Sequence, residues 1–76
     1  MPVSGNRIAK QLGITIRAVR EELGMTQADL AEKAGLGANF IGEIERAEKL
    51  ASIETVVLIA GGLVMTGEKL LGRAKL

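Results

Sequence analysis

The chain has 76 residues, enough for one small domain near the lower size limit for a core without disulfides or metals. It has no cysteine, no histidine and a single aromatic residue, which excludes disulfides, thiolate metal sites and imidazole chemistry and leaves almost nothing to stack on unpaired bases. Ten basic and nine acidic residues give a net charge of +1, so attraction to nucleic acid must depend on where the charges lie.

The first predicted element is a helix from about Asn6 to Leu23, after a short arm at 1–5 that we expect to be loosely held. Apolar residues recur along it at spacings of four, three and four: Leu12, Ile16, Val19 and Leu23. Gly13 costs roughly 1 kcal/mol relative to alanine inside a helix, so the true start could lie near this glycine. Gly24 is predicted to end the helix.

The stretch from Met25 to Ala47 has the outline of a helix-turn-helix. Thr26 and Asp29 have the spacing of a capping box at the start of the first of these two helices. Gly35 stands where a helix end needs a left-handed residue, and Leu36 is the expected buried pivot of the turn. The second helix is predicted to direct three apolar residues inward: Phe40, Ile41 and Ile44.

Two further helices are predicted after a charged linker, with Ser52 and Thr66 as their N-caps. The first of them is apolar on more than one face, so we expect it to be widely buried or to pack against a second subunit. Its apolar run, 56–65, is about half as long as a membrane span, which favours a buried helix. Gly61 and Gly62 are expected to loosen the end of this helix.

The whole pattern predicts an all-α fold of five helices in a single domain, 1–76, with a fraying tail at 72–76. No uninterrupted apolar segment follows the first basic residues, so we expect no signal peptide and a cytoplasmic location. The chain lacks a glycine-rich phosphate loop and a carboxylate pair placed to suggest a cleft. Together with the missing histidine and cysteine, these features argue against an enzyme.

Several motifs agree in register with one known family: IRAVREELGMTQADLAEKAGL, then IGEIER, then SIETVVLIAGGL and the closing EKLL. From about Leu12 to Leu71 the chain resembles the Cro/CI-type (Xre) helix-turn-helix family of small bacterial and phage regulators. The resemblance implies a lambda-repressor-like domain that binds double-stranded DNA as a homodimer and regulates transcription sequence-specifically, without a cofactor or a metal.

The resemblance also implies roles for individual positions. Gln27 matches a glutamine that contacts the DNA backbone beside a helix N-terminus, where unpaired N–H groups and the helix dipole favour phosphate. Arg20 and Glu45 match a structural salt bridge between the first helix and the recognition helix. The positions expected to face bases are Ala38, Asn39, Gly42 and Glu43. The positions expected to contact phosphates are Arg17, Thr26, Gln27, Lys33, Gly37, Arg46 and Lys49.

The base-facing positions depart from the polar residues that this family commonly carries there. Asn39 is the best direct reader, because its amide can bond bidentately to adenine, and Ala38 could touch a thymine methyl group. Glu43 either accepts from cytosine N4 or is a solvated charge, and Gly42 either allows close approach to DNA or makes no contact. We therefore expect few base contacts and a larger share from phosphates and DNA shape.

The fourth and fifth helices carry the predicted dimer interface: Leu58, Val64 and Leu70. Three other apolar residues are expected to belong to the intramolecular core: Ile53, Val57 and Ala60. Ala47 and Val64 replace glycines that are usual at two helix ends. A β-branched residue disfavours positive φ, so we expect the chain at Val64 to be reshaped.

Two functional questions stay open on the sequence. A Cro-like repressor and a restriction-modification controller of this size are not separated. An antitoxin-like or adaptor-like protein-interaction module is the alternative of a different class, and the near-neutral charge and the Gly/Ala/Glu recognition face favour it. That alternative predicts weak DNA binding that does not distinguish sequences, together with tight association with a protein partner.

Overall fold

The computed structural model describes residues 5–76, and five α-helices with no strand make up this part of the chain. They are α1 (Gly5–Glu22), α2 (Gln27–Ala34), α3 (Ala38–Glu45), α4 (Ile53–Gly62) and α5 (Gly67–Arg73). The predicted all-α, five-helix fold is confirmed. Of the arm expected at 1–5, the first four residues lie outside the described part, and Gly5 already begins α1.

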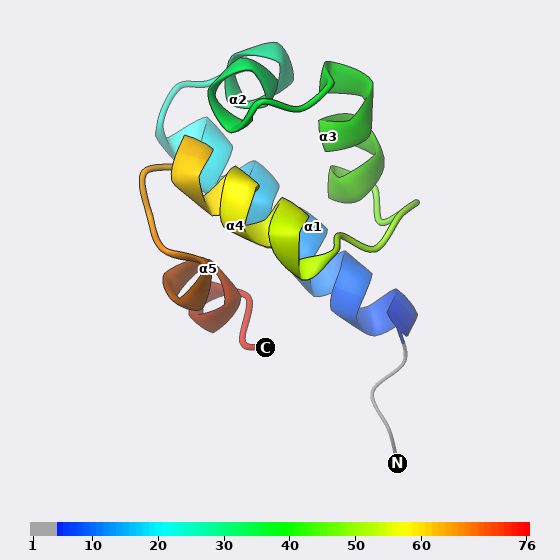
Figure 1. The fold of residues 1–76 in the computed structure, drawn as a ribbon. Helices are drawn as coiled ribbons and strands as arrows, with labels where there is room; N and C mark the ends of the chain where they lie inside the picture. Colours follow the sequence, from blue (N-terminus) through cyan, green and yellow to red (C-terminus); the bar gives the residue numbers. More distant parts are fainter. Residues whose placement is uncertain (1–4) are drawn as a thin grey trace.

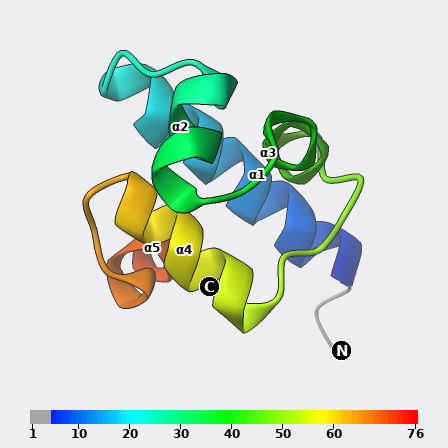
Figure 2. The ribbon, with the colours of Figure 1, turned by 45° about the horizontal axis from the view of Figure 1, so that its top comes forward.

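The helices are arranged so that α2 and α3 lie at one end of the molecule and α5 at the other (Figure 1). α2 packs against α3 and α4, α3 against α1, and α5 against α4 and α1. Figure 2 shows α3 and α5 on opposite sides of α4. One core joins these contacts, and its largest fully buried side chains are Leu12, Ile16, Leu30, Ile41, Ile44, Ile59 and Leu70.

Gly13 lies in the middle of α1 and not near its start, which corrects the alternative that the helix begins there. A Cβ built on Gly13 would lie 2.5 Å from the carbonyl oxygen of Ile44 and 2.7 Å from that of Glu45. The absent side chain therefore lets the end of α3 pack directly on α1. Leu23 was predicted to continue the apolar stripe, but α1 ends before it and the residue is 50% exposed.

Replacing Gly13 with alanine is expected to lower the free energy of unfolding by about 1–3 kcal/mol, although alanine is the better helix former. The added methyl group would force α1 and α3 apart, because backbone carbonyls cannot rotate away from it. Thermal unfolding followed by circular dichroism measures the change. Gly72→Ala is the matched control: a Cβ there meets nothing within 4 Å, so it should stabilise α5. Equal gains in both variants would contradict the close packing at Gly13.

The predicted start and end of α2 are confirmed in atomic detail. The Thr26 hydroxyl accepts from the Asp29 backbone N–H at 3.0 Å, and the Asp29 carboxylate accepts from the Thr26 N–H at 2.9 Å. The hydrogen bond that the Thr26 backbone N–H donates to the carboxylate lowers the pKa of Asp29. Gly35 ends the helix with φ 72°, and Leu36 packs partly buried against the core. The three-residue turn then leads directly into α3.

The capping predictions for the last two helices are also confirmed. The Ser52 hydroxyl accepts from the Thr55 N–H, and the Thr66 hydroxyl accepts from the Lys69 N–H, each at 3.1 Å. Gly62 does not loosen the end of α4. A Cβ on it would lie 2.9 Å from Leu30 Cδ1, so this glycine lets α4 approach α2.

Two further expectations about the chain ends and turns are wrong. The tail does not fray, because Ala74 is 2% exposed and the Leu76 N–H donates to the Leu71 carbonyl at 2.9 Å. The turn at Val64 is not reshaped either. Val64 and Ala47 adopt φ of 59° and 61°, the left-handed conformation that a glycine would take, at a cost of about 1 kcal/mol each. Both turns thus keep the geometry of a glycine turn without a glycine.

No single helix among the described residues has the length and apolar composition needed to cross a membrane. α4 and α5 meet those two criteria only as a pair, and the two helices are bent by 92° relative to each other.

Candidate nucleic-acid interface

α3 lies at the end of the molecule opposite α5, and the first turn of this helix is exposed on its outer side (Figure 1). Ala38 and Asn39 are exposed and Glu43 is half-buried. Together with Gln27, Arg46 and nearby groups they line a shallow hollow of about 340 Å³. This hollow combines amide, cationic and anionic groups beside a two-helix unit, and such groups can form hydrogen bonds with a base edge.

Arg20 and Glu45 form a buried, bidentate ion pair that holds α3 on α1. Arg20 Nε lies 2.7 Å from Glu45 Oε2 and Nη2 lies 2.9 Å from Oε1, and the two side chains are 10% and 3% exposed. The hydrogen bond to Glu45 raises the pKa of Arg20. Arg20 Nη1 also donates to the Met25 carbonyl at 2.8 Å, so the same guanidinium fixes the chain just before α2.

Gln27 joins this ion pair, a contact that sequence reasoning did not find. Its side-chain Nε2 donates to Glu45 Oε1 at 3.1 Å. The Glu45 carboxylate of α3 thus accepts hydrogen bonds from Arg20 on α1 and from Gln27 on α2. No sequence signal identifies this bond, because it depends on the angle between α2 and α3.

Gly42 lines the same hollow, beneath two side chains. The residue is buried, and a Cβ on it would lie 2.9 Å from Arg46 Nη1 and 3.2 Å from Gln27 Oε1. The side chains of Arg46 and Gln27 therefore cover the helix at this position. The absence of a side chain at Gly42 is what lets the Arg46 guanidinium lie across α3.

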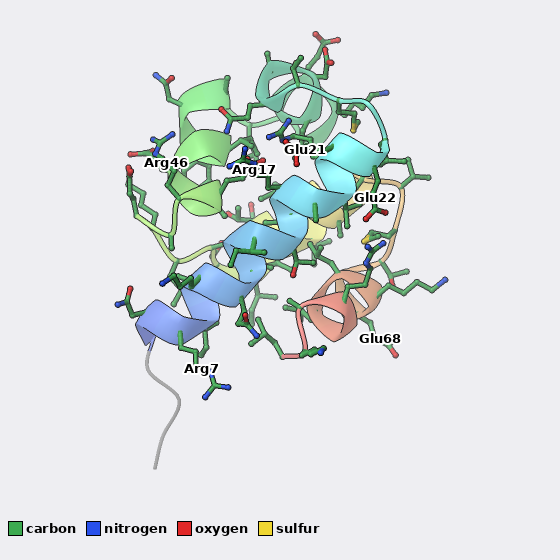
Figure 3. The ribbon with its side chains drawn as sticks, turned by 180° about the vertical axis from the view of Figure 1, so that it is seen from behind. Arg7, Arg17, Glu21, Glu22, Arg46 and Glu68 are labelled. Atoms are coloured by element: carbon green, nitrogen blue, oxygen red, sulfur yellow. The ribbon has the colours of Figure 1, made fainter. Side chains whose placement is uncertain are left out.

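Three of the cations expected to contact phosphates are paired with glutamates. Arg46 Nε lies 2.7 Å from Glu48 Oε2, Arg17 Nε lies 3.4 Å from Glu21 Oε2, and Lys49 Nζ lies 3.6 Å from Glu43 Oε2. Arg17 and Arg46 lie on the side of the molecule that carries α3, away from Glu68 on α5 (Figure 3). The other three expected phosphate contacts besides Gln27 are exposed: Thr26, Lys33 and Gly37.

The predicted dimer surface is only partly exposed. Val64 is 85% and Leu58 39% exposed, but Leu70 is completely buried in the core and cannot contact a second subunit. Ile53 and Val57 were expected inside, yet they are 85% and 56% exposed, whereas Ala60 is buried as expected. Spacings of four place Ile53, Val57 and Gly61 along the outer side of α4, and Val64 follows in the turn after the helix. We call these four residues and Leu58 the outer face of α4.

An apolar groove of about 400 Å³ adjoins this face, between the first turns of α1, α4 and α5. Ile53 and Val57 line it, and so do Leu50 and Leu76, which are 56% and 46% exposed. Sequence reasoning missed the groove because α4 has no polar side, so its pattern does not show which apolar residues face outward.

The helix-turn-helix family model (HTH_3) matches residues 16–63, which cover the C-terminal part of α1 and all of α2, α3 and α4. The chain belongs to this helix-turn-helix family. It is 35% identical over 65 residues to the immunity repressor protein of Bacillus phage phi105, covering 86% of this chain and 45% of that repressor. It is 33% identical over 66 residues to the control protein C.SmaI of Serratia marcescens, covering 87% and 79% of the two chains.

The crystal structure of the wild-type restriction-modification controller protein C.Esp1396I superposes on this helix-turn-helix chain with a TM-score of 0.83 and 31% identity. The match covers 90% of this chain and 88% of that one. These relatives are regulators and not enzymes. The predictions of the family, the fold and a DNA-binding transcriptional regulator are therefore confirmed.

Proposed function

We propose that the protein is a sequence-specific regulator that binds double-stranded DNA as a homodimer, with α3 in the major groove. The observation that carries this proposal is the fixed presentation of α3. Its exposed first residues, Ala38 and Asn39, stand on a helix that the buried Arg20–Glu45 pair ties to α1. A reading helix held this way keeps its orientation when it meets the bases, as sequence recognition requires.

Phosphate contacts would surround this helix on both sides. The N-terminus of α2 offers unpaired backbone N–H groups beside Gln27, where an anion is favoured. The cations Arg17, Lys33, Arg46 and Lys49 lie on the surfaces of α1, α2 and the turn after α3. Gly37 would add its backbone N–H and Thr26 its hydroxyl. Such contacts fix the register of the protein on the duplex, whereas Ala38, Asn39 and Glu43 would distinguish bases.

The outer face of α4 and the adjoining groove would bind a second copy of the chain. An interface with two-fold symmetry must be self-complementary, so it needs both protruding side chains and a hollow on the same face. Ile53 and Val57 protrude beside the groove that they partly line. To read a duplex, a dimer formed in this way must place its two α3 helices in successive major grooves, about 34 Å apart.

Selection of binding sites from a random-sequence duplex pool at near-physiological salt tests this function. Enrichment of an inverted repeat with half-sites about one helical turn apart would establish a dimeric sequence reader. The selected site also serves to compare a Cro-like repressor with a restriction-modification controller, since it can be searched for beside either kind of gene. Salt-sensitive binding without any enrichment would contradict the proposal and favour a protein-interaction module.

Asn39→Ala is expected to weaken binding to the selected site by about 1–3 kcal/mol and to leave binding to random duplexes unchanged. The reason is that a lost adenine contact matters only where that adenine is present. Fluorescence anisotropy titrations on both duplexes measure the two affinities. Lys33→Ala is the comparison, because a lost phosphate contact should weaken both duplexes alike. Unchanged specific binding by Asn39→Ala would show that another part of α3 faces the bases.

A further inference from the structure

The Arg46–Glu48 pair is built into the turn that follows α3. Arg46 is the C-cap of α3, and the left-handed conformation of Ala47 turns the chain back on itself. The Glu48 N–H then donates to the Glu43 carbonyl at 2.8 Å, which anchors the backbone of Glu48 to the helix. Its carboxylate meets Arg46 along one edge, with Nε–Oε2 at 2.7 Å and Nη2–Oε1 at 3.3 Å.

This pair lies within the surface that would meet DNA. The Arg46 guanidinium reaches back over Gly42, and both Arg46 and Glu48 line the same hollow as Asn39. The edge of the guanidinium that Glu48 occupies is an edge that binds phosphate oxygens bidentately. The carboxylate therefore takes the place that a phosphate would take. The hydrogen bond from Arg46 lowers the pKa of Glu48, so this carboxylate is charged at neutral pH.

We propose that Glu48 is a specificity-determining residue, which competes with DNA phosphates for Arg46 and thereby lowers sequence-independent affinity. The inference rests on the proposed function, because it assumes that this surface meets double-stranded DNA. General binding depends on cations that release counterions when they reach phosphates. A cation that already has a carboxylate partner contributes less to sequence-independent binding. The base contacts of α3 therefore account for a larger share of the total binding free energy.

Two other expected phosphate-binding cations also have a glutamate partner, each through a single contact. Glu21 holds Arg17 and Glu43 holds Lys49, so three of the expected phosphate-binding cations have a glutamate within 4 Å. Glu48 is the one whose carboxylate makes two bonds to its partner. The whole chain has a net charge of only +1. On the surface that would face DNA, positive and negative charges also nearly balance, because they form ion pairs.

The test compares the wild type, Glu48→Gln, Arg46→Gln and the double variant on a random-sequence duplex over a series of KCl concentrations. Glu48→Gln should tighten binding by about 3- to 10-fold at 0.1 M KCl and steepen the salt dependence by about one phosphate contact, a slope change of roughly 0.9. In the Arg46→Gln background the same change should have little effect. Glu22→Gln is the control, since it breaks an exposed pair with Arg73 away from α3 (Figure 3).

Two results would overturn the proposal. Equal tightening with and without Arg46 would mean that Glu48 acts only as a distant negative charge, and weaker binding would mean that it orients Arg46 for DNA. On a selected site, Glu48→Gln should tighten binding less than on random duplex, so the ratio of the two affinities falls. If selection yields no preferred sequence, the proposed function fails, while the random-duplex comparison still decides the role of Glu48.

Discussion

Replacing Glu45 with glutamine should lower the free energy of unfolding by about 3–5 kcal/mol, the usual cost of removing one partner from a buried ion pair. The Arg20 guanidinium would stay buried without the charge of its partner. The N–H groups of the new amide would also point at the N–H groups of the guanidinium, which cannot accept a hydrogen bond. The Gln27 contact would lose the charge of its acceptor as well. Urea denaturation followed by circular dichroism measures the loss.

Glu21→Gln is the matched control for this prediction, because it removes a glutamate from an exposed Arg–Glu pair on the same helix as Arg20. The Arg17 and Glu21 side chains are 65% and 56% exposed, so the expected loss is below about 1 kcal/mol. A loss of similar size in both variants would show that the Arg20–Glu45 pair is not the desolvated contact that its burial indicates.

Replacing Ile53 with aspartate should convert the proposed dimer into a monomer and weaken binding to the inverted repeat by about 100-fold or more, because two linked half-site contacts become independent ones. The fold should survive this change. Ile53 is 85% exposed and stands in the first turn of α4, where a carboxylate suits the helix dipole. Sedimentation equilibrium gives the mass, and anisotropy titrations give the affinity.

Leu23→Asp is the control for the oligomeric state, since it places the same charge at a half-exposed apolar residue in the turn after α1. It should leave the dimer intact. A dimer that survives Ile53→Asp and still binds the full repeat would place the interface elsewhere on the molecule.

The sequence predicts those parts of the fold that depend on neighbours along the chain. The capping box of Thr26 and Asp29 and the left-handed Gly35 follow from hydrogen bonds within a few residues, and the structure shows both. The pairing of Arg20 with Glu45 was available only through the resemblance to the family, because 25 residues separate them. Local chemistry was therefore a sufficient guide to where helices begin and end.

The features that were missed depend on how helices meet. Gly13 and Gly62 interrupt helical patterns in the sequence, but in the fold each lets a neighbouring helix approach closely. Gly42 looked outward by periodicity and is covered by the side chain of Arg46. The uniform apolar character of α4 hid its outer face, so Ile53 and Val57 were placed inside although both are exposed.

The Glu45 carboxylate joins α1, α2 and α3. Because of this contact, substitutions that the protein could acquire in evolution fall into two kinds. A substitution at Glu45 alters both the orientation of the reading helix and the stability of the fold. A variant of this kind is lost because it unfolds, before it can recognise a new operator. Ala38 and Asn39 are exposed on the same helix and have no such duty in the core. If α3 reads bases as proposed, new operator preferences can be acquired at those two positions while the scaffold beneath them stays constant.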